Sequence, residues 1–279
     1  MSDQNNGNAE SGTEAGKPSK LKLRDVQKAF NGNHVLRGVD LTLGEGKSLV
    51  IIGGSGSGKS VMLKAILGLI TPDSGSILVD GKETMNMDNK GRDEVMRKFG
   101  MLFQGGALFD SLSIWENIGF GLMHNQKKSR EEARAIAVEK LKQVGLSEKI
   151  AESFPAELSG GMQKRVSLAR AIATNPEIIF FDEPTTGLDP IMADVINDLI
   201  VETVRDIGAT ALSITHDMAS VRKIADEVGM IYKGRIIWQG DVDNLDDSGN
   251  DHVHQFINGN AEGPITDDMR EEEMERMRA

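Results

Sequence analysis

Hydrophobic positions along this chain gather in short blocks that polar turns separate. Residues 21–30 (LKLRDVQKAF) alternate apolar and polar side chains, as a half-buried strand does. Residues 47–54 and 177–184 contain continuous apolar runs that end in glycine or an acid, which is typical of parallel strands buried on both faces. Each of these runs lies beside a helical pattern. The alternation predicts an α/β fold.

The middle of the chain has a helical pattern instead. A capping box, Ser129 with Glu132, opens one helix, and Gly145 can end it. The apolar positions between them fall on one helical face: Ala133, Ala137, Leu141 and Val144. Together with the apolar residues 113–122, this pattern predicts a helical insertion over about residues 105–157.

The two ends of the chain differ from its centre. Residues 1–20 are rich in Asn, Gly, Ser and Glu and have little to bury, so we expect a disordered tail. Strand-like runs return at 209–217 and 227–240, and after them the chain becomes polar. We therefore predict one domain over residues 21–240 and a C-terminal extension over 241–279.

Composition excludes several classes of protein. The 279 residues are 39% hydrophobic, which is enough for a sizeable core. The chain has no cysteine, which excludes disulfides and thiolate metal sites and suits a reducing compartment. No apolar run reaches the roughly 18 residues of a membrane-spanning helix, and the N-terminus lacks the apolar core of a secretory signal. A net charge of -11 argues against nucleic acid as a partner, because nucleic-acid binding relies on basic surface.

Residues 53–60 (GGSGSGKS) match the phosphate-binding pattern G-x-x-x-x-G-K-[ST]. Glycines let the loop turn several backbone N–H groups toward phosphate oxygens, and the N-terminus of the next helix adds positive potential. Lys59 would reach the β- and γ-phosphates, and the Ser60 hydroxyl would hold Mg²⁺. The alternative is a chance glycine-rich turn, but this motif follows an apolar strand and precedes an apolar-faced helix. The candidate nucleotide-binding residues are Gly53, Gly54, Ser55, Gly56, Ser57, Gly58, Lys59 and Ser60.

Two acids stand at the end of the apolar run 178–183 (IIFFDE). Asp182 would bind Mg²⁺ through water. The side chain of Glu183 should point in a different direction, where it could act as the general base toward an attacking water. The alternative is a pair of acids that caps a helix after the strand. With the phosphate loop upstream, the pair predicts ATP and Mg²⁺ as cofactors.

Residues 158–165 (LSGGMQKR) resemble the signature of ATP-binding-cassette (ABC) ATPases, and they lie just upstream of 180–190 (FFDEPTTGLDP), as in that family. The other family motifs occur in order over about residues 21–240: Phe30 of the adenine-stacking loop, Gln104 of the Q-loop, Asp189 of the D-loop and His216 of the switch. The resemblance implies an ATPase with a RecA-like parallel-sheet core, an antiparallel β subdomain and a helical subdomain.

The resemblance also implies roles for single residues. Glu183, His216 and Gln104 would be catalytic, with His216 at the γ-phosphate. The implied metal ligands are Ser60, Gln104 and Asp182. Phe30 stands where Tyr is commoner and keeps the π-face that would stack on adenine. On residue chemistry alone, a lone histidine after a strand is more often a surface or packed residue.

The signature residues Ser159, Gly160 and Gly161 begin a helix, with Ser159 as N-cap. Its apolar face is Val166, Ala169 and Ala173. Such a helix end attracts anions, although by itself it could be an ordinary capped helix. The resemblance implies that it meets the γ-phosphate of ATP bound by a second copy, in a head-to-tail homodimer, with Asp189 as a further nucleotide-contacting residue. Met162 departs from the family, because Gln is commonest at its position.

Three functions are compatible with an ABC ATPase: the motor subunit of a membrane transporter, a soluble cassette protein that works on DNA or ribosomes, and a regulator with a degenerate site. The third is disfavoured because every catalytic position is intact. The second usually needs two cassettes, a long insertion or basic surfaces, whereas this chain has one cassette, a short insertion and an acidic balance. The transporter motor is therefore expected, with separate membrane-spanning permease subunits.

Residues 101–122 are similar to the Q-loop region of ATPases of the Mla (maintenance of lipid asymmetry) type, and 254–265 (HQFINGNAEGPI) resemble their C-terminal extension. The resemblance implies phospholipid transport between the inner and outer membranes of Gram-negative bacteria, from the cytoplasmic face of the inner membrane. Its implied partners are a permease, a lipid-binding anchored protein and a small STAS-domain protein, and the extension would reach across to the other ATPase subunit. An importer of small solutes such as amino acids is the alternative, and 254–265 could also be an ordinary surface tail.

The remaining segments carry two further expectations. Gln104 lies where a buried strand ends, and the glycines after it give a hinge its freedom. Ala107, Leu108 and Phe109 would line the groove where a permease helix docks, or would pack the core of the insertion. The acidic end 266–279 is expected to be a solvated, frayed helix, with a partner-binding tail as the alternative.

Overall fold

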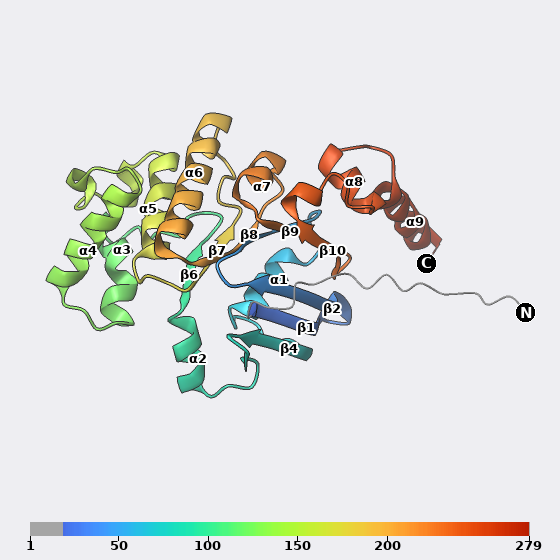
Figure 1. Ribbon diagram of the computed structural model, residues 1–279, viewed down its shortest axis with the longest axis horizontal. Helices are drawn as coiled ribbons and strands as arrows, with labels where there is room; N and C mark the ends of the chain where they lie inside the picture. Colours follow the sequence, from blue (N-terminus) through green and yellow to red (C-terminus); the bar gives the residue numbers. More distant parts are fainter. Residues whose placement is uncertain (1–18, 279) are drawn as a thin grey trace, which may run out of the picture.

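The computed structural model describes residues 19–278. Most of the predicted N-terminal tail, residues 1–20, lies outside the described residues, and Ser19 and Lys20 already belong to the first strand, β1. Figure 1 shows a helical part at one end of the molecule, a central sheet with helices packed on it, and a second sheet beside the first.

A six-stranded sheet forms the centre, in the order β10-β9-β3-β8-β7-β6. All pairs are parallel except β9 with β10. Phe180 and Phe181 point to opposite faces and both are fully buried, as expected for a parallel sheet covered on both sides. The strands are β3 (Ser48–Ile52), β6 (Phe99–Leu102), β7 (Ile178–Asp182), β8 (Thr210–Ile214), β9 (Glu227–Tyr232) and β10 (Arg235–Asp241).

The second sheet is antiparallel, in the order β2-β1-β4-β5. Helix α1 (Lys59–Ile66) joins the two sheets, because its Met62 packs in one core with Leu23 of the antiparallel sheet and Phe180 of the central sheet. The predicted antiparallel β subdomain is therefore present. It comprises β1 (Ser19–Phe30), β2 (Asn33–Gly44), β4 (Ser74–Val79) and β5 (Lys82–Glu83), and α2 (Asn89–Met96) follows it.

The other face of the central sheet shares a core with helices. They are α5 (Gly160–Ile172), α6 (Pro190–Ile207), α7 (Met218–Ile224) and, beyond α5, α3 (Ile114–His124) and α4 (Arg130–Gln143), with 3-10 turns at Glu148–Ile150 and Pro155–Glu157. The predicted insertion is thus helical. The predicted apolar face of α4 is fully buried: Ala133, Ala137, Leu141 and Val144.

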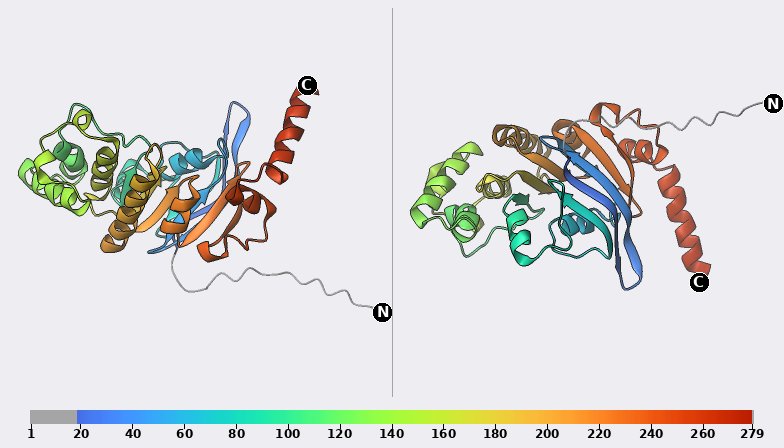
Figure 2. Two further views of the ribbon diagram at one scale, coloured as in Figure 1. Left: turned by 90° about the horizontal axis from the view of Figure 1, so that it is seen from above. Right: turned by 60° about the horizontal axis from the view of Figure 1, so that its bottom comes forward.

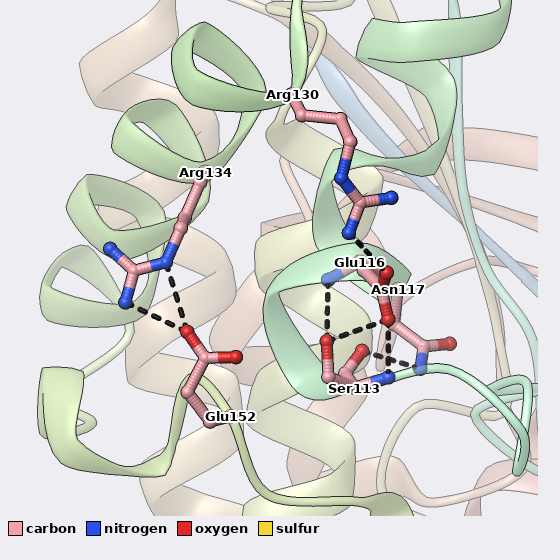
Figure 3. Close-up of polar contacts among 6 residues, drawn as sticks. All are labelled: Ser113, Glu116, Asn117, Arg130, Arg134 and Glu152. Atoms are coloured by element: carbon pink, nitrogen blue, oxygen red, sulfur yellow. Dashed lines mark hydrogen bonds and ion pairs between the residues drawn. The ribbon is translucent and has the colours of Figure 1, made fainter.

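Capping boxes start both helices of the insertion. The predicted Ser129–Glu132 box begins α4, and a second box, Ser113 with Glu116, begins α3. Arg130 pairs with Glu116 at 2.8 Å, which links the starts of the two helices (Figure 3). The local sequence therefore encodes where these helices begin.

Packing of the core continues past residue 240. Leu245 and Val253 are fully buried in the same core as α5 and α6. After a 3-10 turn, Val242–Asn244, α8 (Asp251–Asn258) lies on the domain. The last helix, α9 (Pro264–Arg278), projects from the body at the end opposite α3 and α4 (Figure 2). Within residues 19–278, no helix has the length and apolarity to span a bilayer.

Candidate nucleotide-binding site

The glycine-rich loop connects β3 to α1 and needs its glycines. Gly53, Gly56 and Gly58 have φ angles of 151°, 75° and 111°, where residues with a side chain are strained. A Cβ on Gly53 would lie 2.3 Å from the carbonyl oxygen of Ile231. A Cβ on Gly54 or Gly56 would instead meet open space. The loop thus bares its backbone on the side where a phosphate would bind.

Lys59 begins α1 and folds back over this loop. Its Nζ donates to the carbonyl oxygens of Gly53 (2.6 Å) and Gly54 (2.8 Å). Burial lowers the pKa of Lys59, and the nearby carboxylates of Glu183 and Asp182 oppose that shift. The ammonium group is therefore held by the loop carbonyls, and the charges of the two acids favour its protonated form.

The groups predicted separately along the chain line one cleft of about 750 Å³. They meet because the carboxyl ends of parallel strands lie at the same edge of a sheet. The predicted residues in its wall are Gly53, Gly54, Ser55, Gly56, Gly58, Lys59, Ser60, Gln104, Asp182, Glu183 and His216. The Ser57 hydroxyl is buried and, among the described residues, has no hydrogen-bond partner. Phe256 of α8 also lines the cleft, which the motifs did not predict.

The two acids are held in different ways at the end of β7. Burial raises the pKa of the Asp182 carboxyl, and the negative charge of Glu183 adds to the effect. Glu183 has a φ of 48°, a conformation that costs a non-glycine residue about 1–3 kcal/mol and is concentrated at active sites. Its backbone N–H donates to the Ile214 carbonyl of β8 at 2.9 Å, which helps to hold the strained residue.

The predicted base and the predicted switch histidine are in contact. His216 Nδ1 lies 2.9 Å from Glu183 Oε1, and Thr186 Oγ1 donates to Glu183 Oε2 at 3.1 Å. The Glu183 side chain is only 12% exposed, whereas that of His216 is 66% exposed. Glu183 is therefore oriented through both carboxylate oxygens, and the imidazole stands at the open side of the cleft.

Side chains of α5 hold the segment that follows Gln104. Lys164 Nζ donates to the Gln104 carbonyl, and Ser167 Oγ lies 3.1 Å from the Gly106 carbonyl. Arg170 donates to the carbonyl oxygens of Gly106 and the next residue at 2.7 and 2.6 Å. Burial lowers the pKa of both Lys164 and Arg170. Lys164 lies within the signature 158–165, whereas no motif marks Ser167 or Arg170. Polar side chains three positions apart on a mostly buried helix are a signal that could have found them.

Several predicted site residues do not line this cleft. Phe30 is 43% exposed, with Lys28 Nζ 5.3 Å from its ring centre. Ser159 caps α5 by accepting from the backbone N–H of Met162 at 3.4 Å. Asp189 caps α6 in the same manner. The signature with its Gly160 and Gly161 and the D-loop therefore stand at helix starts outside the cleft of their own chain.

Phe109 lies in a separate groove of about 400 Å³, whose wall also contains Ala107 and Phe120. The Phe109 ring is 4.9 Å from that of Phe120, while Leu108 packs into the core instead. Buried Asn117 fixes the Phe109 backbone, accepting from its N–H at 2.7 Å and donating to its carbonyl at 3.1 Å. Of the three predicted docking residues, two thus face the groove. Figure 3 shows Asn117 beside the start of α3.

The cleft fits Mg²⁺ bound together with a nucleotide. Mg²⁺ prefers oxygen ligands and is usually held by one or two carboxylates plus phosphate oxygens and waters. The Ser60 hydroxyl, the Gln104 amide and the Asp182 carboxylate line the same cleft. Within residues 19–278, no group of three or more His, Asp or Glu side chains is placed to hold a metal without a nucleotide.

Known proteins resemble the chain over most of its length. The profile of the ABC transporter family matches residues 36–186. The intermembrane phospholipid transport ATP-binding protein MlaF of Haemophilus influenzae is 39% identical, covering 81% of this chain and 86% of that protein. MlaF of Escherichia coli is 36% identical, covering 88% and 91%. A Mycobacterium tuberculosis protein named "Probable ribonucleotide transport ATP-binding protein mkl" is 39% identical, covering 88% and 68%.

Solved structures resemble the fold over most of the chain. A dimeric structure of a bacterial ABC transporter cassette has a TM-score of 0.73 and 34% identity, covering 80% of this chain and 98% of that one. A dimeric cassette in a post-hydrolysis state, bound to ADP and Pi, has the same scores.

Proposed function

Because the chain belongs to the ATP-hydrolysing subunits of ABC transporters, we propose that it powers the movement of phospholipid between the inner and outer membranes and so maintains lipid asymmetry. The main support is the similarity to MlaF proteins over most of both chains. Ribonucleotide transport is a second candidate, because a mycobacterial relative carries that name. None of the relatives described above is named for amino-acid transport.

We assign the chemistry to residues of the cleft. The loop amides and Lys59 bind the phosphates of ATP, and Ser60, Gln104 and Asp182 hold Mg²⁺, which would neutralise the developing phosphate charge. Glu183 accepts the proton of the attacking water. The contact of 2.9 Å between Glu183 and His216 orients the two side chains together. Phe30 stacks on adenine when nucleotide is present.

The second copy completes the site. Ser159, Gly160, Gly161 and Asp189 stand at exposed helix starts away from the cleft of their own chain, where the N-terminal dipole of α5 favours an anion. We propose that they contact ATP held by the other copy in a head-to-tail dimer. The dimeric cassettes of the same fold support this arrangement.

We propose that the membrane partners dock at the Phe109 groove. The groove has a mostly apolar lining, which suits a permease helix. Helix α5 connects the groove to Gln104, because Arg170 and Lys164 of this helix hold the segment that follows Gln104. A change at the nucleotide would thereby alter the position of the docked permease helix. The chain would then work peripherally at the cytoplasmic face of the inner membrane. A lipid-binding anchored protein and a STAS-domain protein remain proposed partners, and the C-terminal extension with residues 254–265 is the segment we expect to reach the other ATPase subunit.

The test is transport by the complex in proteoliposomes. The full chain, purified with the membrane proteins that copurify with it, should transfer labelled phospholipid to acceptor vesicles in an ATP-dependent way. A Glu183→Gln complex of the same subunit composition should transfer none. ATP-driven accumulation of a labelled ribonucleotide, without lipid transfer, would replace the lipid proposal with the second candidate.

A further inference from the structure

A buried polar cluster lies behind the switch histidine. Its members are Ser220 of α7, Asn197 of α6 and Thr185, two residues beyond Glu183, and they are 0%, 3% and 6% exposed. Thr185 lies within the motif 180–190, and no motif marks Asn197 or Ser220. Three polar side chains at such depth are costly unless they are hydrogen-bonded, and their placement connects three segments that approach the catalytic cleft.

Ser220 is the centre of this cluster. Asn197 Nδ2 donates to Ser220 Oγ at 2.9 Å, and Ser220 Oγ donates to Asp217 Oδ2 at 2.5 Å. Thr185 Oγ1 lies 3.3 Å from the same oxygen. A serine hydroxyl has one proton to give, and Ser220 gives it to the carboxylate, so the Thr185 hydroxyl is the donor to Ser220. Ser220 therefore accepts two hydrogen bonds and donates one.

Asp217, which directly follows His216, connects the cluster to the histidine through its hydrogen bond with Ser220. The Asp217 carboxylate caps α7 by accepting from the N–H groups of Ala219 and Ser220, each at 3.2 Å. The Asp217 N–H in turn donates to Thr215 Oγ1 at 3.1 Å. The backbone on the C-terminal side of His216 is thus fixed from within the protein, whereas the imidazole itself is 66% exposed and contacts Glu183.

We infer that Ser220 is a positioning residue for His216, and that Asn197 and Thr185 tie this position to α6 and to the loop after Glu183. Helix α6 begins directly after Asp189 of the D-loop. The Ser220 hydroxyl therefore connects three parts of the site: helix α6, the segment that follows Glu183, and the segment that carries His216. The inference deepens the proposed function, because it rests on the role proposed there for His216. A purely structural role would lower stability without changing turnover in the folded protein.

The chain supplies a matched control. Ser213 on β8 is also 0% exposed, and among the described residues its Oγ has no hydrogen-bond partner. Ser220→Ala and Ser213→Ala therefore remove the same atom from equally buried sites, but only the first breaks the cluster. Thr185→Val keeps the side-chain shape and removes the donor to Ser220. It serves as the second variant should Ser220→Ala fail to fold.

The experiment measures steady-state ATP hydrolysis, melting temperature and the imidazole signals of the full chain. We expect Ser220→Ala to lower kcat about tenfold, with KM for ATP changed less than about twofold. Thr185→Val should lower kcat about threefold, and Ser213→Ala should match the parent. Ser220→Thr, which restores the hydroxyl, should recover turnover. The chain has five histidines, so His216→Ala identifies the His216 Cε1–H signal in nucleotide-free protein, and Ser220→Ala should displace that signal.

The outcomes separate this inference from the function it rests on. If His216→Ala abolishes turnover while folded Ser220→Ala and Thr185→Val keep parental kcat and an undisplaced His216 signal, the inference is wrong and the role of His216 stands. If His216→Ala retains full turnover, the role proposed for His216 is wrong and the inference falls with it. Equal losses in Ser220→Ala and Ser213→Ala would also overturn it, because a general effect of core serines would then explain both.

Discussion

The catalytic cleft and the final helix of the C-terminal extension are held to the protein by different forces. Asp182, Glu183 and His216 stand at the ends of β7 and β8, whose inner side chains, such as Phe180 and Ile214, are buried almost completely. Burying one such side chain contributes about 1.5–3 kcal/mol. The proposed catalytic groups therefore stand at the ends of strands whose side chains are buried in the core.

The end of the extension has no such support. The first turn of α9 is anchored by Ile265, which packs on the core and donates its N–H to Gln255 at 2.7 Å. Beyond that turn, α9 is attached by what we call the α9 charge cluster: Tyr232 Oη donates to Asp268 at 2.8 Å, and Lys233 pairs with Asp268 and Glu272 at 3.0 and 2.9 Å. Exposed ion pairs contribute roughly 0–1 kcal/mol and are screened by salt. The cleft thus stands on a buried sheet, whereas most of α9 is attached through partly exposed polar contacts that salt can screen.

The largest expected effect is on ATP turnover, from a substitution in the cleft that leaves the fold unchanged. Glu183→Gln should lower ATP turnover by about 10²–10⁴-fold, because an amide cannot accept the proton of the attacking water. Nucleotide affinity should stay within a few-fold of the parent, since Lys59 and the loop are unchanged. Turnover and equilibrium ATP binding measured on one preparation check both parts. Parental turnover in the folded variant would show that another group is the base.

Two truncations test whether the extension divides into a core part and a loosely held part. Removal of 245–279 deletes the buried Leu245 and Val253, so we expect a loss of more than about 3 kcal/mol and a melting temperature about 10 °C lower. Removal of 267–279 deletes mostly exposed groups and should cost less than about 1 kcal/mol. Thermal unfolding of both forms gives the answer. Similar losses for the two would contradict the division.

Features set by residues close in sequence could be predicted in advance, whereas features set by tertiary packing could not. The α4 face and its Ser129–Glu132 box were predictable because helix periodicity and capping act within a few residues. The glycine loop was predictable for the same reason. The buried residues of α8 were not, because the residues around Val253 are polar and only the folded chain brings this short helix against the core. The contacts of Lys164 with the Gln104 segment, 60 residues away, carry no local signal either.

A smaller effect probes how firmly the cleft holds phosphate. Lys59→Ala removes a charged donor that the fold aims at the loop, and we expect ATP affinity to fall about 10–100-fold, since hydrogen bonds from charged groups contribute about 1.5–3 kcal/mol. Isothermal titration checks this. Lys82→Ala, an exposed lysine of β5, is the matched control and should bind like the parent. Unchanged affinity in Lys59→Ala would place the phosphates elsewhere in the cleft.

The smallest expected effect concerns the α9 charge cluster, and the pKa of Tyr232 measures this cluster directly. Tyr232 is the only tyrosine of the chain. Burial, reinforced by the hydrogen bond to Asp268, raises the pKa of Tyr232 to about 12. Since this pKa lies above the ordinary 10.0, the contact stabilises α9 fully below pH 10 and is lost as the pH rises from 10 toward 12.

Ultraviolet titration of the phenol should therefore give a pKa near 12 in the full chain and a value closer to 10 once residues 267–279 are removed. Asp268→Asn should fall between them, because the amide still accepts the hydrogen bond but carries no charge. Hydrogen exchange of α9 amides should quicken at 1 M salt, where the Debye length is only about 3 Å, while amides of the buried β7 stay protected. If truncation leaves the phenol pKa unchanged, Asp268 does not hold Tyr232, and α9 is attached through the apolar contacts near Ile265 instead.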